Sequence, residues 1–272
     1  MPKDTFIREK ITVEIENAIC SAFDILKSQF DYYDSNTFRS GNTYESLQLA
    51  IWELFENNRR NAFYASGRNQ SNVSVNFILS DAQWFRKLDL LEFTICWMQN
   101  HFLENDSRRR NIQYFIYYLN ERFKSLRFAY RIIGNQIIEI TTEEEIVEIE
   151  KALSHKDNIS EHINSALKLL SQRPDPDFRN SIKESISAVE CICREQTGKS
   201  SLGDALKELR LKGTNIPKIL INAFEKLYVY TNDKSTGIRH ALMDDGNTPC
   251  YEEAKYMLVT CSAFINYIKT KL

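Results

Sequence analysis

The feature that most limits the possible folds is a scarcity of residues that interrupt helices. The chain has 272 residues but only 8 glycines and 5 prolines, the two residue types that most often end or bend helices. Apolar residues recur every three or four positions through long segments such as residues 12–33 and 178–197, which is typical of helices with one buried face. The chain is therefore predicted to be mostly α-helical.

Two local signals qualify this pattern in the first half of the chain. Residues 66–76 are polar and contain glycine, which predicts a loop. Ser80, followed three residues later by Gln83, forms a capping-box pattern ahead of a very apolar segment, so a central helix is predicted to begin there.

The helical pattern changes at residues 128–141, where β-branched and aromatic residues surround a Gly134-Asn135 pair. This arrangement predicts a two-stranded hairpin. The hairpin and the polar gap that follows it mark a junction between domains. We expect an N-terminal helical accessory domain at residues 1–155 and a C-terminal antiparallel helical bundle at residues 156–272.

The C-terminal half carries clear helix boundaries. Asp177 precedes a long predicted helix, and Gly198 stands where a C-cap glycine is expected. The buried face of that helix is predicted to carry Ile182, Ile186, Val189 and Ile192. A last helix is predicted from residue 252 to about residue 270, with Ala254, Met257, Leu258, Cys261, Phe264, Ile265 and Ile268 on its buried side.

Composition excludes several classes of protein. The net charge of −2 and the pI near 6.2 argue against a uniformly basic surface for nucleic acid. The 6 cysteines lack zinc-ligand spacing, so we expect buried free thiols in a reducing compartment. No positively charged start precedes an apolar run, so we expect no signal peptide, and no apolar run approaches the roughly 18 residues of a membrane span. A cytoplasmic protein without membrane contact is expected.

P-loop, GxGxxG, HExxH and GxSxG strings are absent, which argues against NTPases, dehydrogenases, zinc proteases and serine hydrolases.

The stretch at residues 228–245 gathers groups that suit acid–base chemistry on a phosphate. It contains Lys234, Arg239 and His240 among the carboxylates Asp233, Asp244 and Asp245. A histidine exchanges protons near neutral pH, and a neighbouring cation stabilises phosphate oxygens. We assign His240 and Arg239 as candidate catalytic residues, with Lys234 and Asn232 contacting substrate. The alternative is that His240 caps a helix and Arg239 pairs with Asp244 or Asp245.

A second polar cluster stands at the start of the long predicted helix. Arg179, Asn180 and Glu184 would contact substrate if this turn faced the histidine segment, because helix-terminal N–H groups favour phosphate. A solvated first turn with an Arg–Glu pair is the competing interpretation. The other histidines, including His162, have no partner at a useful spacing along the sequence.

Residues 108–110 are three consecutive arginines, followed by Tyr114, Tyr117 and Tyr118. Cations and stacking rings of this kind can contact RNA. Such a run is more often a solvated helix start backed by aromatic core residues, so both interpretations stay open.

Three strings in the second half resemble the C-terminal half of AbiJ-type abortive-infection proteins, which is similar to HEPN domains. They are RNSIKESISAVE at residues 179–190, LYVYTNDKSTGIRHALMDD at 227–245 and EAKYMLVTCSAFINYI at 253–268. FAYRIIGNQIIEITTEEEI, which begins at Phe128, resembles the end of the family's N-terminal domain. The resemblance therefore implies an AbiJ-type accessory domain followed by a HEPN-like bundle.

The resemblance also implies a function. Many HEPN domains are metal-independent ribonucleases that act as toxins in phage defence, and two copies form one composite site. Their signature is an arginine and a histidine separated by four to six residues. In this sequence Arg239 directly precedes His240, and Lys234 stands at the signature distance. Lysine does not fork two bonds to a phosphate as guanidinium does.

We therefore expect an antiphage ribonuclease toxin that cleaves tRNA or mRNA without a metal or another cofactor. A homodimer is the expected assembly, with an antitoxin or a partner from a defence operon as a further possible contact. The alternative is a non-catalytic HEPN-like module that binds nucleotide, RNA or a partner protein.

Overall fold

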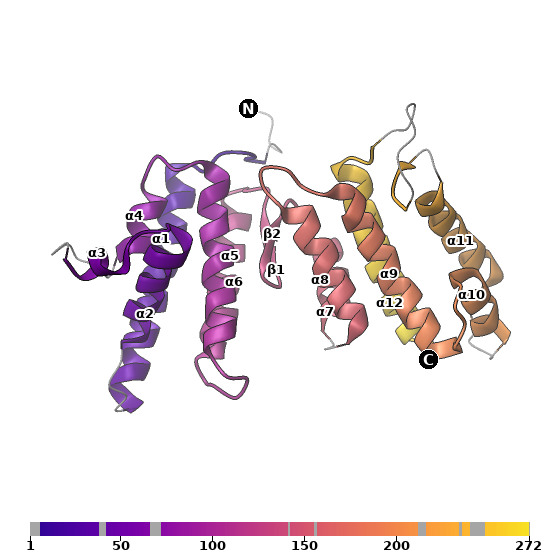
Figure 1. Ribbon diagram of the computed structural model, residues 1–272, viewed down its shortest axis with the longest axis horizontal. Helices are drawn as coiled ribbons and strands as arrows, with labels where there is room; N and C mark the ends of the chain where they lie inside the picture. Colours follow the sequence, from indigo (N-terminus) through magenta and orange to yellow (C-terminus); the bar gives the residue numbers. More distant parts are fainter. Residues whose placement is uncertain are drawn as a thin grey trace. The chain divides into compact units, whose positions relative to one another are not determined.

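The computed structural model describes residues 6–37, 42–65, 72–140, 142–154, 157–211, 216–233, 236–239 and 248–271. Over these residues the chain is mostly helical with one small hairpin, which confirms the predicted fold class. The chain divides into two compact units, unit 1 at Met1–Thr141 and unit 2 at Thr142–Leu272. Both are drawn in Figure 1, and each is described by itself below.

Unit 1 is built from helices and the hairpin. Its elements are α1 (Val13–Thr37), α2 (Thr43–Ala50), the π-helix η1 (Ile51–Phe55), α3 (Arg60–Ala65), α4 (Val73–Ile78), α5 (Trp84–His101), α6 (Arg109–Ser125), β1 (Arg131–Ile133) and β2 (Gln136–Ile138). Helix α1 packs against α6 and against α2 and α4. Buried aromatic residues join these helices, as where Phe23 of α1 meets Phe115 of α6 edge to face at 5.5 Å between ring centroids.

Helix α4 corrects the end of the loop predicted at residues 66–76, because Val73–Ile78 is helical; residues 66–71 lie outside the described residues. Its polar residues are satisfied by tertiary contacts. The Ser74 N–H donates to Oε1 of Gln48 at 2.9 Å, and Nε2 of Gln48 donates to the Ser74 hydroxyl at 3.1 Å. Both residues are fully buried. A polar sequence thus folds as a buried helix because its partner stands on α2.

The hairpin forms where the sequence predicts it. Strands β1 and β2 pair antiparallel, with Ile132 opposite Ile137, and Gly134 in the turn has φ 61°, a left-handed conformation that favours glycine. The side chain of Asn120 on α6 bonds to the backbone of Ile132 in both directions, each at 2.8 Å. This contact fixes the hairpin against α6.

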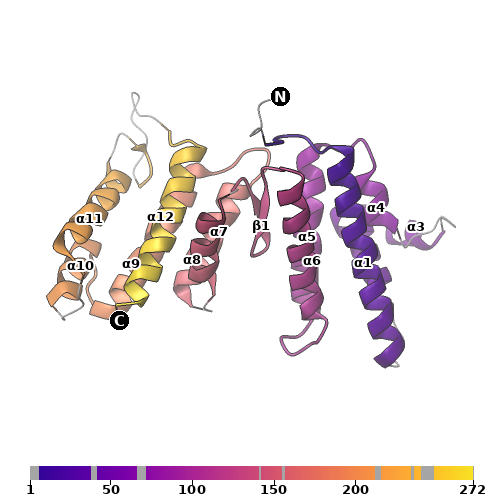
Figure 2. The same cartoon turned by 180° about the vertical axis from the view of Figure 1, so that it is seen from behind.

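Unit 2 contains six described helices with α9 at its centre. They are α7 (Glu143–Leu153), α8 (Asn158–Ser171), α9 (Phe178–Thr197), α10 (Leu202–Leu211), α11 (Lys218–Asn232) and α12 (Tyr251–Lys269). Helix α9 packs against α8, α10, α11 and α12, and Figure 2 shows α12 beside α9 from the opposite side. The apolar faces predicted for α9 and α12 are buried.

The ends of α9 follow the sequence signals. The Asp177 carboxylate accepts the backbone N–H of Asn180 at 3.0 Å, and Gly198 closes the helix with φ 71°. Helix α7 packs on α8 and α12, so it belongs to unit 2. The sequence-based domain boundary at residue 155 assigns α7 to the N-terminal domain, and that boundary stays a prediction.

The described helices include none with the length and apolar character needed to cross a membrane. All six cysteines are free thiols. Cys193 and Cys261 are buried as predicted, whereas Cys96 and Cys250 are exposed, so the expectation of uniformly buried thiols is wrong for these two.

Candidate functional site

The predicted catalytic stretch is described in part. Its described residues run to 233 and from 236 to 239. His240, Lys234, Asp244 and Asp245 lie outside the described residues, and so does the proposed pairing of Arg239 with either aspartate. The geometry of the site therefore rests on Arg239 and the elements that hold it.

Arg239 is held between two helices. Its Nη2 forms an ion pair with Oε1 of Glu190 on α9 at 3.1 Å, and its Cζ lies 5.2 Å from the ring centroid of Tyr228 on α11. The side chains of Arg239 and Glu190 are 21% and 18% exposed. A cation over an aromatic face and beside a carboxylate is held in one orientation, so this guanidinium is positioned from both sides.

The segment that presents Arg239 is shaped by short-range bonds. The Thr236 hydroxyl donates to the carbonyl of Asp233 at 2.8 Å and accepts the N–H of Ile238 at 3.4 Å. Gly237 has φ 63°, a left-handed conformation. The side chain of Ile238 is 1% exposed. A buried isoleucine thus anchors the segment and leaves its neighbour Arg239 partly exposed.

Arg179 contacts the same segment from the first turn of α9. Its Nε donates to the carbonyl oxygen of Ile238 at 3.4 Å. Glu190 follows Arg179 by eleven positions, which places both on one face of α9, about 16 Å apart along the axis. One face of α9 therefore holds residues 238–239 at two points, and the structure brings Arg179 and Arg239 to one segment.

The other predicted substrate-binding residues are engaged elsewhere. The Asn180 side chain donates to Oδ2 of Asp177 at 2.6 Å, within the N-cap of α9. The Asn232 side chain donates to the carbonyl of Tyr228 at 3.2 Å, within α11. Glu184 faces α8 rather than the 236–239 segment. The contacts of Asn180 and Asn232 are local to their helices, that of Glu184 is with another helix, and none of the three adds a group around Arg239.

Glu184 forms a contact that sequence reasoning missed. Its Oε2 lies 2.7 Å from Nδ1 of His162 on α8, and the two side chains are 27% and 39% exposed. No partner stands near His162 along the sequence, and the structure supplies one from α9. The pair joins antiparallel neighbours, since Ser181 of α9 likewise bonds to Ala166 of α8 at 2.8 Å. Only the register of α8 on α9, which is not visible as a spacing in the sequence, could have revealed it.

The thiols of α9 do not supply a nucleophile. Burial raises the pKa of Cys193 to about 12. Burial, with a hydrogen bond to Glu195, raises the pKa of Cys191 to about 11. The thiolate is the reactive form, so neither side chain is activated at neutral pH. No group of histidine, cysteine or acidic side chains within the described ranges is arranged to hold a metal ion.

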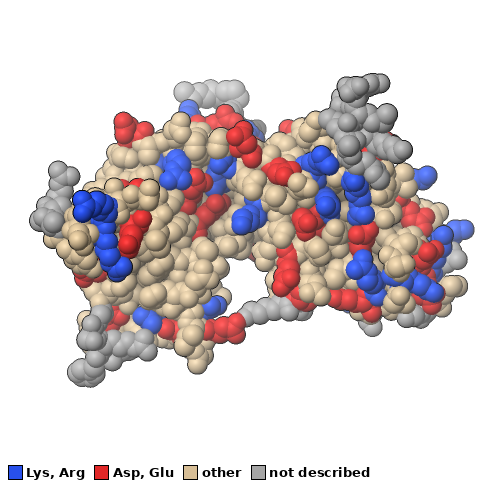
Figure 3. Space-filling view, in the orientation of Figure 1, with Lys and Arg blue, Asp and Glu red and all other residues tan. Residues whose placement is uncertain are grey.

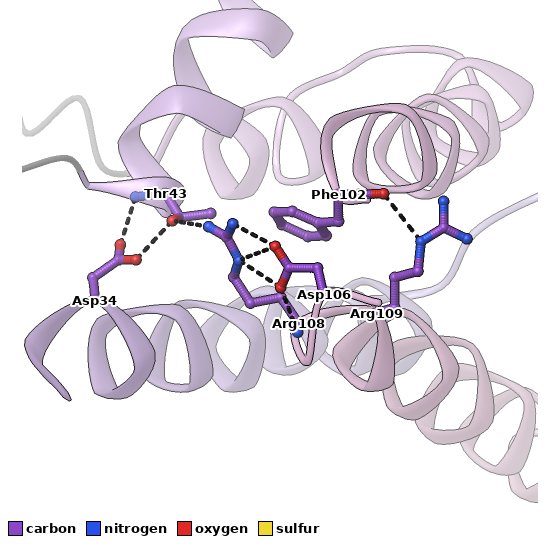
Figure 4. A network of polar contacts seen from close by, with 6 residues as sticks. All are labelled: Asp34, Thr43, Phe102, Asp106, Arg108 and Arg109. Atoms are coloured by element: carbon purple, nitrogen blue, oxygen red, sulfur yellow. Dashed lines mark hydrogen bonds and ion pairs between the residues drawn. The ribbon is translucent and has the colours of Figure 1, made fainter. Parts of the chain in front are cut away.

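The arginine run of unit 1 is largely structural. Arg108 is 6% exposed, and its guanidinium binds Asp106 through Nη2 at 2.7 Å and the Thr43 hydroxyl through Nη1 at 3.0 Å. Arg109 donates to the carbonyl of Phe102 at 3.0 Å. Figure 4 shows these contacts, with Asp34 bonded to Thr43 on the other side. Arg108 is thus unavailable to a phosphate, so neither RNA contact nor a solvated helix start describes this residue, whereas Arg110 is exposed.

The exposed charges of both units are mixed in sign. On the face shown in Figure 3, Lys and Arg side chains are interspersed with Asp and Glu side chains. This surface agrees with the net charge of −2.

Residues 1–155 match a family model described as AbiJ N-terminal domain 4. The match covers more than half of the chain and extends through α7 into unit 2. No curated protein and no solved structure matches the sequence. The chain belongs to the AbiJ N-terminal domain 4 family, and this membership suggests a role in abortive-infection defence.

Proposed function

We propose that this protein is an abortive-infection effector that cleaves RNA without a metal, through His240 and Arg239 in a HEPN-like C-terminal domain at residues 156–272. Family membership supports the defence role. The resemblance of residues 179–268 to HEPN domains supports the reaction. The single observation that carries the proposal is that Arg179 bonds to the backbone of Ile238, next to Arg239, on the segment that leads into His240.

The chemistry follows from the side chains. His240 accepts the proton of the RNA 2′-hydroxyl or donates a proton to the leaving 5′-oxygen. Arg239 stabilises the charge that builds on the phosphorane oxygens. In a homodimer with paired sites, one histidine acts as base and its counterpart as acid. Arg179 and Lys234 bind neighbouring phosphates of a tRNA or mRNA.

The test compares purified wild-type protein with His240→Ala on total RNA in buffer with EDTA. Extract from phage-infected cells is added in a parallel series, because a defence effector can require a trigger. Cleavage by the wild type alone supports the proposal. Equal cleavage by both proteins, or none by either in both series, refutes it.

The second candidate is a non-catalytic module that binds nucleotide, RNA or a partner protein of a defence operon. The ion pair between Arg239 and Glu190 favours it, because a carboxylate 3.1 Å away offsets the charge that catalysis needs. Under this alternative, RNA or nucleotide binds equally well to wild type and to His240→Ala, and no cleavage occurs.

A further inference from the structure

The contact between Arg239 and Glu190 uses only half of one guanidinium edge. The Nε and Nη2 atoms of an arginine together bind two oxygens of one carboxylate or phosphate. Here Nη2 pairs with Oε1 of Glu190. The Nε atom is buried and has no hydrogen-bond partner among the described residues. A buried donor without an acceptor is unfavourable, so this edge is satisfied incompletely.

The remaining contacts hold that edge in place. The Tyr228 ring lies under the guanidinium, 5.2 Å from Cζ, and it supports an arginine without using any of its N–H groups. The backbone is fixed next to Arg239 by the Arg179 bond to Ile238 and by burial of the Ile238 side chain. Among the described residues, Glu190 is therefore the anionic group that pairs with the Nε–Nη2 edge of Arg239, and this edge has donors for two oxygens.

We propose that Glu190 is an intramolecular latch, which occupies Arg239 in the resting protein and is displaced by a phosphate group of RNA. The phosphate takes both Nη2 and Nε, whereas Glu190 takes Nη2 alone. Displacement releases the Glu190 carboxylate to solvent and satisfies the buried Nε. The inference rests on the proposed function of Arg239 and adds its regulation.

If Glu190 is a latch, its substitution should strengthen RNA binding. If Glu190 merely positions Arg239, its substitution should weaken RNA binding. Glu190→Gln keeps the size of the side chain and removes the charge that competes with phosphate. RNA should bind about fivefold more tightly, which converts to about 1 kcal/mol. The dependence of log affinity on log salt should steepen by about 0.7, the value for one further phosphate contact on a single strand. A positioning role would instead weaken binding.

The experiment measures fluorescence anisotropy of a labelled single-stranded RNA in EDTA. All proteins carry His240→Ala, so that the probe stays intact. The comparison includes the parent, Glu190→Gln, Arg239→Gln and the double variant. The matched control is Glu195→Gln, which removes the same charge from an exposed position on α9, where Glu195 contacts Cys191. Glu190→Ala also removes the ion pair with Arg239, but it shortens the side chain as well. Circular dichroism checks that each protein is folded.

The latch predicts tighter binding for Glu190→Gln and Glu190→Ala, no change for Glu195→Gln, and no gain from Glu190→Gln when Arg239 is already glutamine. Unchanged or weaker binding by Glu190→Gln, a gain that persists without Arg239, or no RNA binding by any protein would overturn it. Absence of RNA cleavage by the wild type would refute the nuclease proposal, and this binding comparison would still decide the latch.

Discussion

Replacing Arg108 with methionine should destabilise unit 1 strongly. The change keeps an unbranched apolar stem but removes the guanidinium that bonds to Asp106 at 2.7 Å and to Thr43 at 3.0 Å. It also removes a cation 4.4 Å from the centroid of the Phe102 ring. Arg108 and Asp106 side chains are 7% and 12% exposed. Loss of one partner of a fully buried ion pair costs about 3–5 kcal/mol. Because this pair is partly buried, we expect a loss of about 2–4 kcal/mol.

The assay is urea unfolding followed by tryptophan fluorescence. The chain has 3 tryptophans, Trp52, Trp84 and Trp97, and all belong to unit 1. The signal therefore reports on the unit that contains the substitution. Each free energy of unfolding is obtained by linear extrapolation, which requires that the slope with urea is unchanged.

Two comparisons make the result decisive. Arg110→Met applies the same change to an exposed arginine of the same run and should alter stability by about 0.5 kcal/mol or less. Arg108→Met combined with Asp106→Asn replaces a charged pair by a neutral one and should cost less than Arg108→Met alone. A loss below about 1 kcal/mol for Arg108→Met would refute the reasoning, as would a double variant less stable than the single one.

Two further predictions concern unit 2 and are measured by circular dichroism. Gly198 has φ 71°, and an alanine Cβ there would meet no atom within 4 Å, so Gly198→Ala should lower the stability by about 1 kcal/mol through backbone strain alone. Gly203→Ala within α10 should instead raise the stability, by about 1 kcal/mol at most; equal effects would contradict this. A hydrogen bond from Asn266 is the main cause that lowers the pKa of Glu148 from 4.5. The group therefore stabilises the fold above that pH and loses this contribution as pH falls through the folded value. The stability difference between wild type and Asn266→Ala should shrink as the pH falls, and a difference independent of pH would count against it.

Local sequence signals predicted the parts of the fold that depend on local physics. Gly198 ends α9 because few other residues adopt a left-handed C-cap at low cost. Gly134 allows the hairpin turn for the same reason. The apolar spacing of α9 and α12 identified their buried faces because a helix repeats every 3.6 residues.

The errors arose where distant contacts decide the structure. Ser80 carries a capping-box pattern, but α5 begins at Trp84, and the Ser80 hydroxyl instead bonds to the carbonyl of Phe77 at 2.7 Å. Arg108 follows a charged loop and is nevertheless buried, because Asp106 and Thr43 satisfy it. A short local window contains no information about these partners.

The candidate site shows the same division. The sequence singled out Arg239 and Arg179 from their chemistry, and the structure brings both to the segment before residue 240. It did not indicate Glu190, which lies 49 positions before Arg239 and meets it only because residues 236–239 pack along α9. Glu184 was assigned to substrate, while its described partner is His162 on α8.

The end groups of the RNA fragments test the central claim most directly. Attack by the 2′-hydroxyl leaves a 2′,3′-cyclic phosphate on one fragment and a 5′-hydroxyl on the other, and the reaction needs no metal ion. The account predicts these ends in EDTA from wild-type protein, with or without extract from phage-infected cells, and none from His240→Ala. Fragments with 5′-phosphate ends, or the same fragments from both proteins, would contradict it.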